Sequence, residues 1–372
     1  MNTIDTKGDE QTYAEIVERN ITEIIDDELA YIGEEAFQAC YSLTTASFPA
    51  VTYIGTYAFA DCSSLTSVSF PAVTYISTYA FRACSSLTTV SFPALTSIGD
   101  DAFANCASLT SVSFPAVTHI GNYAFAYCSS LTSVSFPNAS SYIGNYAFAN
   151  CTMLTSISFP ALTSISNYAF ANCASLTSVS FPAVTYIGTY AFQSCYSLTT
   201  VSFPAASYIG NSAFQSCSSL TDISFPVASL IGSSTFQNCY SLTTASFPAV
   251  TRINYKAFAQ CYSLTTTSFP ALTSIDGYAF ADCSSLTSVS FPAVTYIAYS
   301  AFIYCSSLMS LYLTNSSIAT LGNAAVFTNT PMSNSSYTGS FGSIYVPASL
   351  VSEYKAATNW SVYSDRITAY TE

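Results

Sequence analysis

Charged residues are scarce in this chain of 372 residues. They make up 7% of the total, against about a quarter in an ordinary globular protein. Twenty acids outnumber seven bases and give a formal charge of −13. The bases are spread along the sequence, as Lys7, Arg19, Arg82, Arg252, Lys256, Lys355 and Arg366. A protein that neutralises phosphates needs its bases gathered on one face, so we expect neither nucleic acid nor an anionic membrane as a partner.

Long apolar runs are also missing. None approaches the roughly 18 consecutive apolar residues of a membrane helix, which predicts no membrane insertion. The first residues, MNTIDTKGDE, have neither the basic nor the apolar region of a secretory signal. Composition alone therefore does not indicate a compartment.

Catalytic and metal-binding motifs are absent from the sequence. There is one histidine, His119, and no C-x-x-C pair, G-x-S-x-G, P-loop or H-E-x-x-H. His119 occupies the position that holds Tyr53 and Tyr75 elsewhere, which favours an ordinary substitution. A catalytic histidine would need a nucleophile and an orienting acid at hydrogen-bond distance. We predict no enzyme activity, no catalytic residue, no metal and no cofactor.

What the sequence has instead is a repeat. Its 13 cysteines lie 22 residues apart, except for a gap of 23 between Cys128 and Cys151, where FPNASSYIG carries one residue more than FPAVTYIG. Such a period is typical of stacked units that are stable only together. We predict an array of 13 units over 29–314, an N-terminal cap over 1–28 (a helix and a degenerate strand) and a C-terminal cap over 315–372 (a strand and a helix).

The segment LTSVSFPAVTYISTYAFRAC, residues 65–84, illustrates the unit. Its predicted core positions are Leu65, Val68, Phe70, Val73, Ile76, Ala80, Phe81 and Cys84. The alternation before Pro71 predicts a short strand with Ser67 and Ser69 pointing outward, and proline ends it. Thr78 lies at a position that holds Thr, Asn, Asp or Ser in nine units. These residues cap helices, which predicts a short helical turn.

The cysteines invite a disulfide or metal interpretation. Equivalent residues of successive turns lie about 4.8 Å apart with parallel side chains, which leaves the Cβ atoms too far apart for an unstrained disulfide. We expect a buried row of free thiols that pack as small hydrophobes, with disulfides as the alternative.

The frame L-x-x-L-x-L-P, followed by L-x-x-I-G-x-x-A-F-x-x-C, resembles that of the BspA-like, or Treponema-type, bacterial leucine-rich repeats. The resemblance implies an α/β-type repeat solenoid, a right-handed leucine-rich-repeat superhelix with a parallel concave sheet of short strands and short helical turns opposite. It also implies an extracellular or cell-surface location, since such proteins are typically found on host-associated microbes and are thought to engage host or neighbouring-cell proteins.

Tyrosines recur at two positions beside the core frame. The first tyrosine column contains Tyr31, Tyr53, Tyr75, Tyr142, Tyr186, Tyr208 and Tyr296. The second contains Tyr57, Tyr79, Tyr123, Tyr146, Tyr168, Tyr190 and Tyr278. Tyrosine is favoured in interfaces, although the rings could equally stack on one another. Arg252, Tyr255 and Lys256 disturb the columns beside Tyr278. These four are the candidate ligand-binding residues, with sequence drift as the alternative explanation.

The leading functional hypothesis is a non-enzymatic recognition module that binds extracellular proteins, with glycans as a second ligand class. We expect this module to be a monomer. One alternative is a structural spacer or display rod, for which a uniform surface is enough. Another is a surface for polysaccharide or ice, formed by outward serine and threonine hydroxyls.

Overall fold

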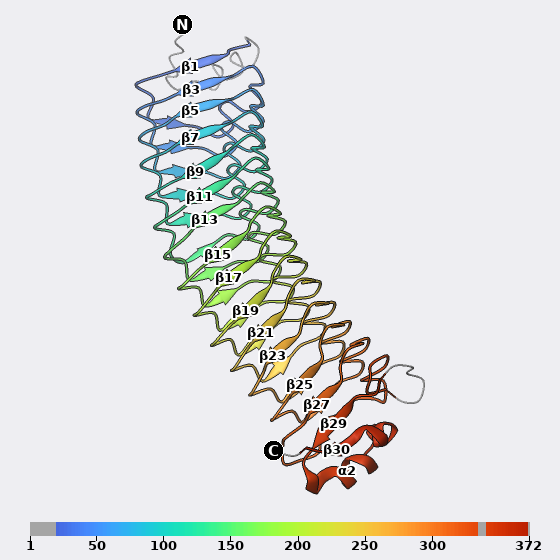
Figure 1. The fold of residues 1–372 in the computed structure, drawn as a ribbon. Helices are drawn as coiled ribbons and strands as arrows, with labels where there is room; N and C mark the ends of the chain where they lie inside the picture. Colours follow the sequence, from blue (N-terminus) through green and yellow to red (C-terminus); the bar gives the residue numbers. More distant parts are fainter. Residues whose placement is uncertain (1–19, 334–339, 371–372) are drawn as a thin grey trace. The chain divides into compact units, whose positions relative to one another are not determined.

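The computed structural model describes residues 20–333 and 340–370. The chain divides into two compact units, residues 1–183 and 184–372. Within each unit the polypeptide winds as a β-solenoid of parallel strands with little helix (Figure 1).

Unit 1 contains two rows of short strands. The long-strand row consists of β1 (Glu23–Ile25), β3 (Thr45–Ser47), β5 (Ser67–Ser69), β7 (Thr89–Ser91), β9 (Ser111–Ser113), β11 (Ser133–Ser135), β13 (Ser156–Ser158) and β15 (Ser178–Ser180). The short-strand row consists of β2 (Tyr31–Ile32), β4 (Tyr53–Ile54), β6 (Tyr75–Ile76), β8 (Ser97–Ile98), β10 (His119–Ile120), β12 (Tyr142–Ile143) and β14 (Ser164–Ile165).

Strand pairing in unit 1 places equivalent residues of successive turns side by side. Val68 of β5 is opposite Val90 of β7, and Tyr53 of β4 is opposite Tyr75 of β6. The 23-residue turn keeps this register, because Ile120 of β10 still pairs with its counterpart in β12. The extra residue is absorbed in the loop between β11 and β12. The predicted stacking in register is confirmed within this unit.

Unit 2 has the same two rows. Its long-strand row consists of β17 (Thr200–Ser202), β19 (Asp222–Ser224), β21 (Thr244–Ser246), β23 (Thr266–Ser268), β25 (Ser288–Ser290) and β27 (Ser310–Tyr312). Its short-strand row consists of β16 (Tyr186–Ile187), β18 (Tyr208–Ile209), β20 (Leu230–Ile231), β22 (Arg252–Ile253), β24 (Ser274–Ile275), β26 (Tyr296–Ile297) and β28 (Thr320–Leu321).

The C-terminal part of unit 2 departs from the repeat. It consists of β29 (Ser343–Val346), the 3₁₀ helix η1 (Ala348–Leu350), α2 (Val351–Ala356), the 3₁₀ helix η2 (Ser361–Arg366) and β30 (Ile367–Ala369). β29 pairs with β27 on one side and with β30 on the other. The helix predicted from Thr12 and Glu15 lies outside the described residues, and the boundaries 1–28, 29–314 and 315–372 stay predictions. No helix in residues 20–333 and 340–370 is long and apolar enough to span a membrane.

The core follows the predicted frame. All eight positions of the unit 65–84 are buried, seven of them completely and Val68 with 8% exposure. Phenylalanines of successive turns stack inside: the rings of Phe59 and Phe81, and those of Phe81 and Phe103, have centroids 5.2 Å apart and are nearly parallel. Each ring therefore contacts its copies in the turns before and after it, which is why one turn alone cannot form this core.

The 13 cysteines are free and buried, as expected. In unit 1 the thiols from Cys62 to Cys173 each donate to a phenylalanine carbonyl of the preceding turn, with Sγ···O distances of 3.0–3.3 Å. Burial raises the pKa of the interior thiols, that of Cys128 to about 12. Cys40 differs, because its side-chain interaction with the Cys62 thiol lowers its pKa.

This contrast predicts selective alkylation. With iodoacetamide at pH 8 under reducing conditions, we expect Cys40 to be modified first, because the thiolate is the nucleophile. Interior thiols such as Cys128 should react only after denaturant is added. Peptide mapping by mass spectrometry measures the order, and Cys40→Ser should remove the fast phase. Comparable modification of interior thiols in the native protein would contradict the buried row.

The predicted short helical turns are not confirmed: residues 56–61 and their copies form turns, not an α-helix. Tyr57 and Asp61 have φ values of 55° and 61°, a left-handed conformation that cannot continue a right-handed helix. The amides of Tyr57 and Phe59 donate to carbonyls of the next turn, at 3.2 and 2.7 Å. Contacts between turns therefore replace the i to i−4 bonds of a helix. The right-handed sense of the coil stays a prediction.

Candidate functional site

The outward hydroxyls are partly used within the fold. In unit 1, Thr66 Oγ1 donates to the Thr44 carbonyl at 3.0 Å and Thr88 Oγ1 to the Thr66 carbonyl at 3.2 Å. Serines of the long-strand row, such as Ser67 and Ser69, are exposed. A lattice of hydroxyls available to an ordered ligand is therefore sparser than the sequence suggests.

The second tyrosine column is a stack of rings on unit 1. Centroids of Tyr57 and Tyr79 are 4.6 Å apart, those of Tyr123 and Tyr146 are 4.6 Å apart, and those of Tyr146 and Tyr168 are 4.3 Å apart, all nearly parallel. Each of these residues has a positive φ between 54° and 59°. The shared backbone conformation points every side chain the same way. The stacking alternative to an interface role is thus observed for this part of the column.

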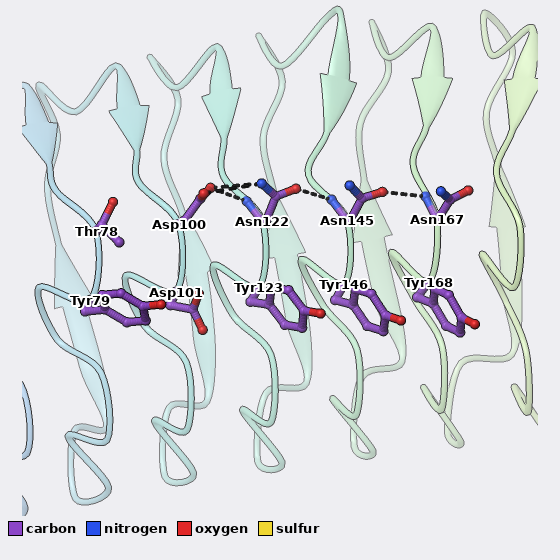
Figure 2. Close-up of a pocket in the computed structure, with 10 residues that line it drawn as sticks. All are labelled: Thr78, Tyr79, Asp100, Asp101, Asn122, Tyr123, Asn145, Tyr146, Asn167 and Tyr168. Carbon is purple, nitrogen blue, oxygen red and sulfur yellow. Dashed lines mark hydrogen bonds between the residues drawn. The ribbon is translucent and has the colours of Figure 1, made fainter.

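Asp101 interrupts that stack. It has the same left-handed conformation, with φ of 54°, and Figure 2 shows its carboxylate in the row of rings between Tyr79 and Tyr123. Burial raises the pKa of Asp101, as does the neighbouring carboxylate of Asp100, while the Arg82 guanidinium acts in the opposite direction. The charge of Asp101 in turn raises the pKa of the Tyr79 phenol.

A groove of about 570 Å³ runs between this column and a parallel row of short polar side chains. Asp100 Oδ1 accepts a hydrogen bond from the Asn122 backbone amide at 2.6 Å, and Asn122 Oδ1 accepts one from the Asn145 amide at 2.8 Å (Figure 2). Residues predicted as helix caps therefore do accept hydrogen bonds from backbone amides, but these amides belong to the next turn and not to a helix. Both walls of the groove belong to unit 1, and each turn contributes one residue to each wall.

The four predicted ligand-binding residues lie on unit 2. Lys256 Nζ is 5.2 Å from the Tyr255 ring centroid and 5.8 Å from that of Tyr278, within range of a cation–π interaction. The two rings meet edge to face, with centroids 5.9 Å apart. The structure thus brings Tyr255, Lys256 and Tyr278 together.

Arg252 has a different contact. Its guanidinium binds Asp276 of the next turn through both carboxylate oxygens, the shortest distance being 2.8 Å. The Arg252 side chain is 60% exposed and that of Asp276 is 19% exposed. The pair is held by two-point geometry, and the outer edge of the guanidinium stays open to solvent.

Sequence reasoning missed two members of this cluster. Most units have a glycine after the buried isoleucine, and this unit has Asp276. That departure from the repeat is the feature by which the sequence could have identified Asp276. Tyr299 packs edge to face on Tyr278, with centroids 5.5 Å apart. A Cβ at Gly277 would lie 2.7 Å from the Tyr299 ring, so a side chain there would displace that ring. We call Arg252, Tyr255, Lys256, Asp276, Tyr278 and Tyr299 the unit 2 cluster.

The residues expected to have no chemical role show ordinary contacts. His119 lies edge-on to Tyr142, with ring centroids 5.5 Å apart. Within the described part of the chain, no three His, Cys, Asp or Glu side chains are grouped so as to hold a metal ion.

Comparisons with known proteins point to one family. The model of the BspA type leucine-rich repeat region matches residues 15–131, 118–243 and 229–348. A leucine-rich repeat protein from Bacteroides ovatus is 25% identical, with a TM-score of 0.66 over 92% of this chain and 88% of that one. A leucine-rich cell surface protein from Faecalibacterium prausnitzii is 26% identical, with a TM-score of 0.45 over 80% and 88% of the two chains. No curated protein matches the chain.

Proposed function

Because the chain belongs to the BspA-type leucine-rich repeat family, we propose that it is a non-enzymatic recognition module, exposed at the cell surface or secreted, that binds other proteins. The proposal includes a monomeric array over residues 29–314 whose turns coil in the right-handed sense expected from the family, with the long-strand row on the concave side. Proteins of a host or of neighbouring cells are the proposed ligands.

The unit 2 cluster is the observation that carries the proposal. Exposed tyrosine and arginine side chains recur at the energetic centres of protein interfaces. Here Asp276 holds Arg252, and the faces of Tyr255 and Tyr278 hold Lys256. Side chains ordered before binding lose less entropy on association. The cluster thus combines positive charge with aromatic surface in a chain that has little of either sign of charge.

The spacer alternative predicts a different behaviour. A display rod needs no centre of binding energy, so substitutions on any exposed position should be equally tolerated.

The polysaccharide alternative depends on the exposed serines of the long-strand rows. Neither accounts for the ordered contacts of Arg252 and Lys256.

The test is binding to a panel of purified extracellular proteins by surface plasmon resonance, followed by the double variant Arg252→Ala/Lys256→Ala. We expect at least one selective partner and a loss of affinity of tenfold or more in the variant, the typical effect of removing central interface residues. Lys355→Ala is the matched control, because it removes an exposed positive charge elsewhere on unit 2.

Two results would overturn the proposal. If no protein binds selectively at any salt concentration, the recognition role is wrong and the rod alternative gains support. If a selective partner binds the double variant as well as it binds the wild type, recognition stands but the unit 2 cluster is not its site.

A further inference from the structure

The gap in the tyrosine stack of unit 1 has the shape of a missing ring. Successive turns of a parallel sheet are about 4.8 Å apart, so Tyr79 and Tyr123 lie roughly 9–10 Å from one another. A flat group placed midway would be about as far from each ring as the tyrosines of the stack are from their neighbours. The inner face of each ring is left without the tyrosine partner that the regular column would supply.

The charge at the gap selects what can enter it. Asp101 lies at the position of the missing ring, and Asp100 lies across the groove from it (Figure 2). Neither carboxylate forms an ion pair with another described residue. Arg82 is nearby, with Cζ 5.7 Å from the Tyr79 ring centroid. A partly buried carboxylate beside a second one is stabilised by an added cation.

The chain itself places a cation at the equivalent position of another turn. Lys256 occupies the second-column position in unit 2, with φ of 56°, and its ammonium lies over two tyrosine rings. This position of the frame can therefore hold positive charge against tyrosine. In unit 1 this position holds an acid, on which the charge of Arg82 also acts, and any further cation has to come from a ligand.

We propose that Tyr79, Asp101 and Tyr123 form a binding slot for a guanidinium group, such as an arginine side chain of a ligand. A guanidinium is flat, stacks on aromatic faces and donates two parallel N–H bonds to a carboxylate. An alkylammonium is a more strongly hydrated point charge and fills a flat slot less well. The slot is in unit 1 and is acidic, so it is separate from the unit 2 cluster.

The probe is N-acetyl-L-argininamide, titrated by calorimetry and by saturation-transfer NMR. We expect weak, saturable binding of one equivalent, stronger than that of butylammonium, and no binding of the neutral isostere N-acetyl-L-citrullinamide. Asp101→Asn should weaken binding at least tenfold. Arg82→Ala should strengthen it, because Arg82 adds a competing positive charge at the rim.

Asp101→Tyr is the decisive variant, since it completes the stack with the residue that neighbouring turns carry at the same φ. Its far-UV circular dichroism and Tm should be unchanged or improved, and its binding should be lost. Tyr146→Asp should create a second slot between Tyr123 and Tyr168 and double the stoichiometry. Wild-type binding retained in Asp101→Tyr, equal binding of the citrulline probe, or no gain in Tyr146→Asp would overturn the slot.

Two further outcomes are informative. If the probe binds Arg82→Ala but not the wild type, Arg82 already fills the gap and the proposed open slot is wrong. Arg252→Ala/Lys256→Ala should bind the probe as the wild type does, so that failure at the slot and failure of the proposed function can be told apart.

Discussion

Raising the pH from 8 to 10.5 is expected to unfold the protein cooperatively, with the transition starting near pH 9. Burial raises the pKa of the thiols from Cys62 to Cys151 and of Cys217, Cys239, Cys261 and Cys283 above the ordinary value of 9.0, although in Cys62 a hydrogen bond with Cys40 is the larger cause. The unfolded chain releases these protons above pH 9, whereas the folded chain keeps them. Stability is therefore complete below pH 9 and falls as the pH rises toward the folded pKa values.

The size of this effect comes from repetition. Each such thiol costs about 1.4 kcal/mol of unfolding free energy per pH unit between its two pKa values. The lowered pKa of Cys40 acts in the opposite direction and offsets that of Cys62. For the other eight thiols the loss at pH 10 is on the order of 10 kcal/mol, comparable with the whole stability of a typical domain of about 5–15 kcal/mol. A single buried thiol would lower the free energy of unfolding by too little to cause such a transition.

Urea denaturation at a series of pH values, with reductant present, measures the slope. Cys128→Ala should reduce it by one proton, which separates the thiols from other groups. Ionic strength provides a second control: the repulsion caused by the formal charge of −13 is screened by salt, whereas the ionisation of unfolded thiols is not removed by it. A free energy of unfolding that is constant between pH 8 and 10 would contradict the buried row.

The core could be predicted from the sequence because its period and its alternation agree. Positions that are apolar in nearly every copy and two residues apart, such as those of Val68 and Phe70, have few alternatives to one buried face of a strand. Thr267 is the exception at the Val68 position. The cysteine spacing fixed the length of each turn. One inserted residue between Cys128 and Cys151 was correctly assigned to the segment that absorbs it.

The turn after Ile76 could not be predicted in the same way. Thr78 and its copies are typical helix caps, and the local sequence does not reveal that their amides and carbonyls bind the neighbouring turn. The short-strand row was missed for a related reason, since two residues such as Tyr75 and Ile76 are too few to show alternation. Both features depend on contacts with the neighbouring turn, about one repeat away in the chain, as in the bond from the Phe59 amide to the Ala80 carbonyl.

The surface sites show the same division. The breaks at Arg252 and Lys256 are visible in the sequence because the frame is so regular. Asp276 was not recognised as the partner of Arg252, nor Tyr299 as a neighbour of Tyr278, because both contacts form only when the turns stack. The sequence also shows that Asp101 replaces a tyrosine in the second tyrosine column. That this replacement leaves a gap in a stack of rings follows only from the structure, in which the tyrosines of successive turns are parallel.

Trp360→Ala is expected to destabilise unit 2 by about 4 kcal/mol or more, the sum of a large core truncation and an unpaired carbonyl. The indole is completely buried, packs edge to face on Tyr354 with centroids 5.1 Å apart, and donates from Nε1 to the Ala319 carbonyl at 2.6 Å. Ala319 immediately precedes β28. The indole therefore supports the last strand of the short-strand row directly.

The loss should be local before it is global, because in a stacked array each turn is stabilised by its neighbours. Hydrogen exchange with mass spectrometry should show lost protection first in β28 and β26, with β4 and β6 of unit 1 unaffected. Trp360→Phe keeps a ring and removes the N–H donor, so it should cost about 1–3 kcal/mol. Val362→Ala, at a side chain that is 45% exposed, should be nearly neutral. If Trp360→Ala instead lowered protection equally in β4 and β28, the turns would unfold as one block, and the nearest-neighbour account of this array would be wrong.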